Sequence, residues 1–154
     1  MISLADTLHP ESVNLDLVAV TAREAIQETA ALLKGRLPVL DWDQLKTELP
    51  KSAPCLAEAA GTFALCLPHA RTDAVSSMVI SVGVSKHGIL FSGCAIPVRY
   101  VFCIALPKAL ASDYLRVVGL LVRILKDTAT EAGLRSALTG ADFVQRLMEL
   151  EVKM

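Results

Sequence analysis

Three histidines are the side chains in this 154-residue sequence whose type best suits group-transfer chemistry near neutral pH. His9 precedes Pro10 and His87 stands in a Lys-His-Gly turn, so we expect both to be solvated surface residues. His69 differs, because it follows an apolar segment and Pro68 and leads into a polar stretch. Sites of α/β folds lie where a strand ends in a loop, although a lone histidine is also often an ordinary loop residue. Position makes His69 the candidate reactive residue.

The other candidates for metal binding or nucleophilic catalysis are four cysteines and two adjacent serines. The cysteines, which have no CxxC spacing, are Cys55, Cys66, Cys94 and Cys103. Cys66 stands three residues before His69, but a single Cys-His pair lacks the further ligands of a zinc site. No nucleophile elbow surrounds Ser76 and Ser77, which disfavours a hydrolase with His69 as general base. We therefore expect reduced thiols, no metal and no cofactor.

Composition and charge restrict the class of protein. Hydrophobic residues make up 53% of the chain and charged residues 20%, which predicts a folded domain with a substantial core. The length fits a single domain over residues 1–154. The net charge of −1 gives no electrostatic signature of nucleic-acid binding. The longest apolar runs are too short to span a bilayer, and the N-terminal segment does not resemble a secretory signal. We therefore expect a cytoplasmic protein without direct membrane insertion.

The first third of the chain predicts two helices. Apolar periodicity indicates a helix over Ala22–Leu37, with Thr21 as its N-cap. Asp41 is a suitable N-cap for a second helix over Trp42–Leu49, which a proline follows. The stretch Lys51–Gly61 is expected to be a loop, with room for one turn of helix in its second half.

The middle third predicts strands. Thr62–Leu67 is expected to be a short buried strand that leads to His69. Met78–Val84 and Ile89–Phe91 are expected to be strands joined by a turn over Ser85–Gly88. Val98–Leu106 is almost continuously apolar, which predicts a strand that is buried on both faces.

The last third predicts three helices. Each follows a serine or threonine N-cap: Asp113–Lys126 after Ser112, Ala129–Leu138 after Thr128, and Ala141–Glu151 after Thr139. Helices on either side of a run of strands predict an α/β fold in which a mixed sheet is sandwiched between helices, as a three-layer single domain.

The segment LCLPHARTD (Leu65–Asp73) resembles the phosphorylation-site segment of the fructose/mannitol-type IIA domains of the bacterial sugar phosphotransferase system. That family includes the nitrogen-regulatory IIA proteins. Four further blocks resemble the family in the same order and spacing. They are Ile2–Leu17, which resembles the opening strand, Val79–Phe91 and Pro97–Pro107, which resemble core strands, and Ser112–Asp127, which resembles the helix after them.

The resemblance implies a phosphocarrier, and thus a transferase component. His69 would accept a phosphoryl group from phospho-HPr or its nitrogen-branch relative. It would then pass the group to a IIB domain, in sugar transport, or keep it as a regulatory signal, as in nitrogen regulation. Imidazole suits this role, because its unprotonated ring nitrogen can attack phosphorus. Arg71 is the nearest cation in sequence and would stabilise the transition state or contact a partner.

The chain departs from the family pattern at three supporting positions. Only Gly61 is retained in the family's glycine-rich approach, which corresponds to residues 60–64. Lys51 is the only available substitute for an upstream arginine of the family. Tyr114 replaces the family's second histidine, although a tyrosine there is also an ordinary residue for the first turn of a helix. The alternative is therefore an impaired IIA-like module that regulates a partner protein by contact, without phosphotransfer.

Overall fold

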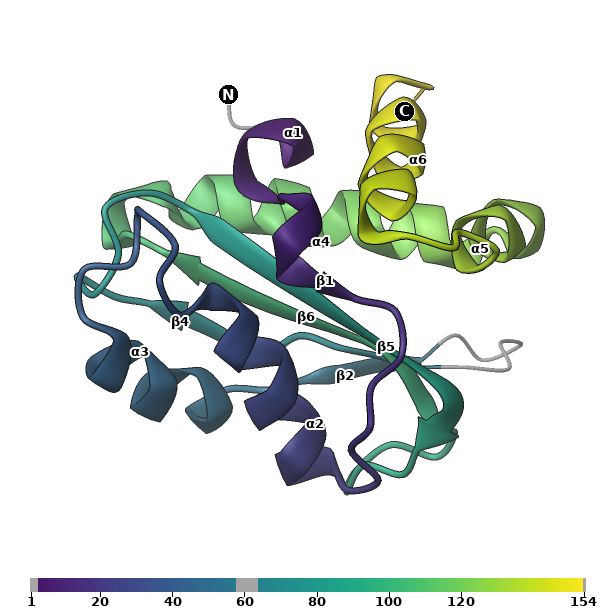
Figure 1. Cartoon of the computed structure of the whole chain (residues 1–154), viewed down its shortest axis with the longest axis horizontal. Helices are drawn as coiled ribbons and strands as arrows, with labels where there is room; N and C mark the ends of the chain where they lie inside the picture. The colour runs from purple at the N-terminus through teal and green to yellow at the C-terminus, as the bar shows by residue number, and fades with distance from the viewer. Residues whose placement is uncertain (1–2, 58–63, 154) are drawn as a thin grey trace.

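The computed structural model describes residues 3–57 and 64–153. Its helical elements are α1 (Leu4–Thr7), η1 (Pro10–Ser12), α2 (Ala22–Ala30), η2 (Ala31–Leu33), α3 (Trp42–Glu48), η3 (Leu49–Lys51), η4 (Lys108–Leu110), α4 (Ala111–Lys126), α5 (Thr128–Arg135) and α6 (Gly140–Lys153). Its strands are β1 (Val13–Asn14), β2 (Cys55–Ala57), β3 (Ala64–Cys66), β4 (His69–Arg71), β5 (Val79–Ile89) and β6 (Val98–Leu106). The elements fold into one unit around a mixed sheet (Figure 1).

Strand β6 lies in the middle of this sheet. It pairs with β5 in antiparallel fashion on one side and with both β3 and β4 in parallel fashion on the other. Strand β1 extends the sheet beyond β5, and β2 extends it beyond β3. Because β3 and β4 follow each other along the same side of β6, the short break between them lies inside the sheet.

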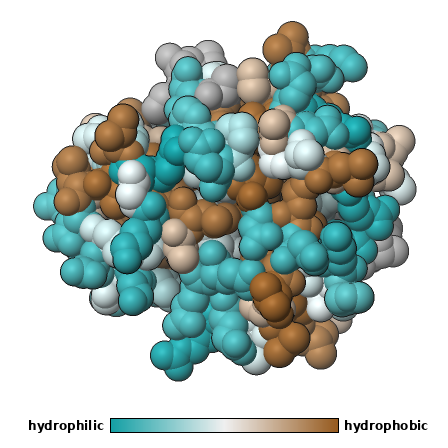
Figure 2. Space-filling model, in the orientation of Figure 1, coloured by the Kyte–Doolittle hydropathy of each residue, from teal (hydrophilic) through white to brown (hydrophobic). Residues whose placement is uncertain are grey.

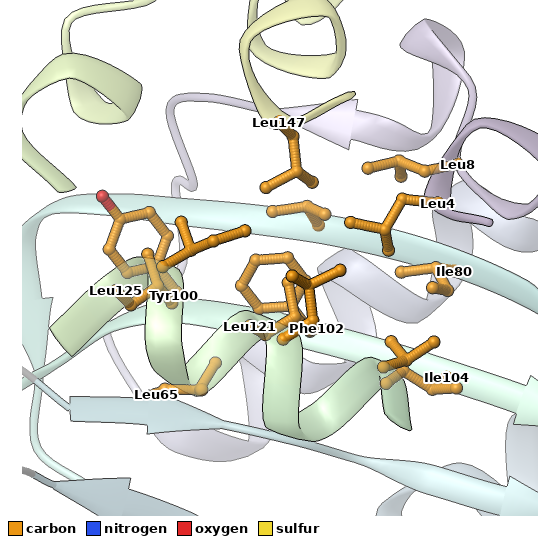
Figure 3. Close-up of a cluster of buried hydrophobic side chains, with 14 of the residues drawn as sticks. Leu4, Leu8, Leu65, Ile80, Tyr100, Phe102, Ile104, Leu121, Leu125 and Leu147 are labelled. Carbon is orange, nitrogen blue, oxygen red and sulfur yellow. The ribbon is translucent and has the colours of Figure 1, made fainter. Parts of the chain in front are cut away.

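The side chains of β6 alternate between two hydrophobic clusters, one on each face of the sheet. One cluster takes Tyr100, Phe102, Ile104 and Leu106, and the other takes Val101, Cys103 and Ala105. Figure 3 shows the first cluster, in which side chains of β6 meet Leu121 of α4 and Leu147 of α6. This confirms the predicted burial of the strand on both faces.

Helices cover both faces of the sheet. In Figure 1, α4 runs along one face with α1, α5 and α6 beside it, while α2 and α3 lie on the other face. The apolar sides of α2 and α3 complete the second cluster, and those of α1, α4 and α6 complete the first. The three-layer α/β arrangement expected from the order of the elements is therefore confirmed.

The first two predicted helices are present and begin where expected. The Thr21 hydroxyl accepts a hydrogen bond from the Glu24 amide (3.2 Å), and the Asp41 carboxylate accepts one from Gln44 (3.1 Å). Helix α2 is shorter than predicted, because its last turn continues as the 3₁₀ helix η2 and the chain then turns at Gly35, whose φ is +84°.

Two predicted N-caps are wrong. Helix α4 begins at Ala111 after Leu110, so Ser112 lies inside its first turn. Helix α5 begins at Thr128, one residue earlier than predicted, and its cap is Asp127. The Thr139 prediction is confirmed, because its hydroxyl accepts a hydrogen bond from the Asp142 amide (3.0 Å).

Several strand predictions also need correction. Residues 85–88 do not end the strand, because β5 continues through them to Ile89, with a register shift between Val84 and Ile89 where it pairs with β6. Gly88 takes a φ of +77°, which lets the strand bend there without a hairpin. Strand β2 occupies part of the predicted loop. The block Ile2–Leu17 resembles the opening strand of the family, but its strand β1 is only two residues long. The expected turn of helix within residues 56–60 is wrong at residues 56 and 57, which belong to β2, and residues 58–60 lie outside the described part of the chain.

The cap of α5 gives a prediction about pH dependence. The Thr130 amide donates a hydrogen bond to the Asp127 carboxylate (2.9 Å), and this bond holds the pKa of Asp127 below its ordinary value. A carboxyl group with a lowered folded-state pKa stabilises the fold above its unfolded-state pKa, and the stabilisation is lost as pH falls through the folded-state pKa. Asp127→Asn keeps a hydrogen-bond acceptor that does not titrate. We expect the free energy of unfolding of this variant to fall less steeply as pH decreases through the acid range.

Urea unfolding at a series of pH values in the acid range measures this dependence. Asp43→Asn, which replaces an exposed carboxylate in the first turn of α3, is the matched control. An acid limb of unchanged slope in Asp127→Asn would contradict the prediction.

The surface mixes apolar and polar side chains. Figure 2 shows hydrophobic groups interspersed with hydrophilic ones on the drawn face. The most exposed large apolar side chains are Val18, Val20, Leu37, Leu90, Leu115, Leu138 and Val152. None of the helices within the described residues is both long and apolar enough to cross a membrane.

Candidate functional site

His69 is the first residue of β4 and follows the short break that separates β4 from the buried strand β3. The predicted strand before it appears as β3 over Ala64–Cys66, and residues 62 and 63 lie outside the described part. The Pro68 carbonyl accepts a hydrogen bond from the Ile104 amide (2.9 Å), which ties the break to β6. Contrary to the loop that the sequence predicts, His69 lies in a strand. It begins β4 and pairs with Ile104, so its backbone is held by the sheet.

The backbone determines which nitrogen of the His69 ring is protonated. Nδ1 lies 3.0 Å from the Leu67 carbonyl oxygen. A carbonyl oxygen only accepts, so Nδ1 must carry the hydrogen and donate it. In the neutral imidazole the lone pair available for chemistry is then on Nε2. The side chain is partly exposed, so this nitrogen belongs to a residue that solvent and a partner can reach.

Ser52 is a neighbour of His69 that the sequence analysis missed. Its hydroxyl oxygen lies 3.4 Å from Nε2, and its carbonyl accepts a hydrogen bond from the His69 amide (2.9 Å). The backbone bond holds the two residues together, and the hydroxyl is therefore placed beside the lone pair of Nε2. No sequence motif marks a serine in an expected loop, so only the packing of this segment against β4 reveals it.

Tyr114 lies against the His69 ring. The two ring centroids are 4.7 Å apart with an interplanar angle of 32°. Tyr114 is in the first turns of α4, and this contact therefore places the start of that helix beside the histidine. Partial burial raises the pKa of the Tyr114 hydroxyl, so the hydroxyl remains a neutral donor at neutral pH.

The two basic residues singled out from the sequence lie on the elements next to the histidine. Arg71 is exposed at the end of β4, and it shares a face of that strand with His69 because side chains two residues apart point the same way. Lys51 is exposed at the end of η3 and directly precedes Ser52. The structure therefore brings Arg71 and Lys51 to the neighbourhood of the site, on its solvent side.

A hydrogen-bond network anchors the end of β4 to α3. The buried Thr72 hydroxyl donates to the Glu48 carboxylate (3.1 Å) and accepts from the Gln44 side-chain amide (3.2 Å). The same amide donates to Asp73 (2.9 Å). These contacts restrain the backbone that follows His69 and Arg71, and the sequence analysis did not predict them, since they join residues from separate elements.

The other candidate residues lie elsewhere or outside the described residues. His9 and His87 are exposed, as predicted. Within residues 3–57 and 64–153, the structure contains no group of three or more His, Cys, Asp or Glu side chains with the geometry of a metal site. Gly61 and its neighbours up to residue 63, the expected counterpart of a glycine-rich approach, lie outside the described part of the chain.

Comparison with known proteins places this site in context. Residues 6–149 match the family model described as phosphoenolpyruvate-dependent sugar phosphotransferase system, EIIA 2. No curated protein matches the chain at a significant level.

Solved structures with the same fold include three of IIA proteins. The nitrogen regulatory protein IIA-Ntr from Neisseria meningitidis has a TM-score of 0.78 and 17% identity, over 94% of this chain and 99% of that one. The mannitol-specific cryptic phosphotransferase enzyme IIA CmtB from Escherichia coli has a TM-score of 0.66 and 18% identity, over 96% and 99%. A complex of the mannitol IIA enzyme with phosphorylated IIB from Escherichia coli has a TM-score of 0.70 and 19% identity, over 93% and 98%. At these identities the similarity shows a shared fold.

Proposed function

The chain belongs to the EIIA 2 family of the phosphoenolpyruvate-dependent sugar phosphotransferase system, and on that premise we propose that it is a phosphocarrier or regulatory IIA-type protein that accepts a phosphoryl group on His69. The donor is phospho-HPr or its nitrogen-branch relative. The group then passes to a IIB domain or remains as a regulatory signal. The hydrogen bond from Nδ1 to the Leu67 carbonyl (3.0 Å) supports the proposal most directly, because it leaves the lone pair on Nε2 of a partly exposed residue.

The transfer step follows from this tautomer. The Nε2 lone pair attacks phosphorus of the donor's phosphohistidine, a new N–P bond forms, and the donor's N–P bond breaks with its electron pair returning to the donor ring. The Leu67 carbonyl holds the Nδ1 hydrogen and stabilises the positive charge that develops on the His69 ring. Subsequent attack by a nucleophile of a IIB domain reverses these roles and regenerates the neutral imidazole.

Several groups are placed to stabilise the phosphoryl oxygens. The Ser52 hydroxyl, 3.4 Å from Nε2, can donate to one of them. Arg71 and Lys51 contribute positive charge on the solvent side. The N-terminal end of α4, which Tyr114 places beside the ring, adds the positive end of a helix dipole. Tyr114 itself is uncharged, so less positive charge is available than with the family's second histidine.

Phosphorylation of the purified protein tests the proposal. Incubation with enzyme I, HPr and phosphoenolpyruvate should add one phosphoryl group, detected by intact mass. The adduct should be labile in acid and stable in alkali, as expected for a phosphohistidine. A parallel incubation uses the nitrogen-branch carriers. Failure to form the adduct with either set of carriers would overturn the proposal.

Ser52→Ala tests the contribution of the serine hydroxyl. Removing a donor to the transferred group typically lowers a rate by 10²–10³-fold in a buried site, and water competes at an exposed serine, so we expect a reduction of about tenfold. Quench-flow measurement of adduct formation gives the rate. Ser77→Ala, at an exposed serine outside the site, is the matched control and should leave the rate unchanged. Equal rates for Ser52→Ala and the unmodified protein would contradict the assigned role.

The second candidate function is regulation of a partner by contact without phosphotransfer. It is favoured by the residues at the start of α4, where an uncharged Tyr114 lies against His69 and the adjacent Leu115 is 70% exposed. An exposed apolar side chain beside the site suits a protein interface whether or not a phosphoryl group is transferred. The two functions differ in whether the chemistry of His69 is required.

A further inference from the structure

Two cysteines lie opposite each other where the outermost strand β2 joins the sheet. Cys55 of β2 and Cys66 of β3 are direct partners in an antiparallel pairing. The neighbouring Leu67 amide donates to the Pro54 carbonyl (2.9 Å), so residues 54 and 67 occupy a hydrogen-bonded position of the ladder. Hydrogen-bonded and non-hydrogen-bonded pairs alternate along an antiparallel ladder. The two cysteines therefore form a non-hydrogen-bonded pair, in which the side chains point to the same face at the closer spacing.

The spacing of this pair suits a disulfide. The Cα atoms of a non-hydrogen-bonded pair are about 4.5 Å apart, and disulfides join residues whose Cα atoms are about 4.4–6.8 Å apart. The Cys55 thiol is in hydrogen-bond contact with the Cys66 thiol, and both thiols are free in this structure. A bond between the two sulfur atoms can therefore form without a rearrangement of the paired backbone.

The two thiols differ in exposure. Cys55 is half-buried against the second hydrophobic cluster, whereas Cys66 is 0% exposed and its thiol donates to the Ala53 carbonyl (3.7 Å). An oxidant can therefore reach Cys55 first, and Cys66 can react with a Cys55 sulfur that it already contacts. Burial raises the pKa of both thiols, so little thiolate is present at neutral pH and the pair stays reduced until an oxidant accumulates.

A third cysteine also contacts Cys55. Cys94 is half-buried in the loop between β5 and β6, and its thiol is in hydrogen-bond contact with that of Cys55. Because Cys94 lies in a loop, strand pairing does not hold its backbone opposite that of Cys55, as it does for Cys66. The strand register therefore favours Cys66 as the partner, and a bond to Cys94 is the competing outcome.

We propose that Cys55 and Cys66 are a modification site for hydrogen peroxide and form a reversible cross-strand disulfide. The Cys55 sulfur attacks one peroxide oxygen, the O–O bond breaks, and the products are a Cys55 sulfenic acid and water. The Cys66 sulfur then attacks the Cys55 sulfur, so that an S–S bond forms and the S–O bond breaks. The hydroxide that leaves takes the Cys66 proton as a second water. Two thiols and one hydrogen peroxide thus give one disulfide and two waters, and a thiol reductant reverses the change.

The cysteine pair lies on the same ladder as the candidate phosphorylation site, but on the other face of the sheet. The His69 amide donates to the Ser52 carbonyl in the same register as Leu67 to Pro54. Cys66 belongs to the second hydrophobic cluster, whereas Tyr114, which contacts the His69 ring, packs against the first. The disulfide therefore leaves the His69 ring accessible, and the proposal does not depend on phosphotransfer.

Peptide mapping of the full chain after treatment with hydrogen peroxide tests the proposal. The treated protein is denatured, alkylated with N-ethylmaleimide and digested with trypsin. The tryptic peptide 52–71 contains both Cys55 and Cys66, while Cys94 and Cys103 fall in other peptides. We expect this peptide to escape alkylation and to be about 2 Da lighter than its reduced form, and dithiothreitol should restore alkylation of both cysteines. Full alkylation after peroxide treatment, a sulfinic acid at Cys55, or a cross-link to the peptide that contains Cys94 would overturn the proposal.

Cys94→Ser is the variant that decides which cysteine is the partner of Cys55. Its substitution is at a half-buried loop residue, so the fold should be retained, and we expect the disulfide within peptide 52–71 to form as in the unmodified protein. Loss of the disulfide in this variant would assign the bond to Cys94 and refute the proposed pair. In Cys55→Ser, at the matched half-buried position, the enclosed Cys66 should remain a thiol after peroxide treatment and be alkylated once the chain is denatured. Oxidation of Cys66 in that variant would show that Cys55 is not where the oxidant enters.

Discussion

His69→Gln is expected to eliminate the phosphoryl adduct completely. Glutamine has a side chain that can still hydrogen-bond, but its amide nitrogen has no lone pair available for attack on phosphorus. The effect should be all-or-none, because the other residues near the ring, Ser52 and Tyr114, stabilise a transferred group without accepting it from a phosphohistidine. Intact mass after incubation with enzyme I, HPr and phosphoenolpyruvate measures the result.

His87→Gln is the matched control for this experiment. His87 is exposed and belongs to β5 outside the site, so this variant should be phosphorylated like the unmodified protein. An adduct that survives in His69→Gln and disappears in His87→Gln would move the acceptor to the other histidine and refute the assignment made above.

The same variant separates the two candidate functions. Once a partner is available, its affinity for His69→Gln can be compared with its affinity for the unphosphorylated protein. A protein that acts by contact alone should bind and regulate its partner equally well in both forms. A protein that signals through phosphohistidine should lose the difference between phosphorylated and unphosphorylated states, since the variant has only one state.

Leu121→Ala is expected to lower the free energy of unfolding by about 2–5 kcal/mol. Leu121 is fully buried on α4 and packs between that helix and β6, in the cluster that Figure 3 shows. The substitution removes buried methyl groups and leaves a cavity that the surrounding strand and helices cannot fill, because β6 is restrained by paired strands on both sides. Urea unfolding measures the change from the transition midpoint.

Leu90→Ala is the matched control, because it removes the same atoms from a side chain that is 75% exposed. Its effect should stay within about 0.5 kcal/mol. If the two variants were destabilised equally, the packing of α4 against the sheet would not be the source of the stability assigned to it.

The helical layers and the central strand could be predicted from the sequence because short contiguous segments carry the signal for each. Val98–Leu106 is apolar at nearly every position, and a strand with that pattern must be covered on both faces. Thr21 and Asp41 stand directly before periodic apolar segments, and both accept the expected hydrogen bonds in the structure. In each case the information lies within a few consecutive residues.

The incorrect predictions concern segments whose local residue pattern is compatible with more than one structure. Ser112 and Thr128 are good N-cap residues, but α4 begins at Ala111 and α5 begins at Thr128 itself, so both residues lie inside their helices. Residues 85–88 contain turn-forming types, yet pairing with β6 extends β5 through them.

The sequence by itself determined the residue types available for chemistry, namely one histidine after an apolar strand, Arg71 shortly after it, Lys51 upstream, and a tyrosine in place of a histidine. Only the tertiary structure decided how they meet. The pairing of β4 with β6 sets the direction of His69, the Leu67 carbonyl determines its tautomer, and the packing of α4 brings Tyr114 against the ring. Ser52 reaches Nε2 from 17 residues away in sequence. Such contacts depend on strand register and helix packing over the whole sheet, which no local pattern of residues encodes.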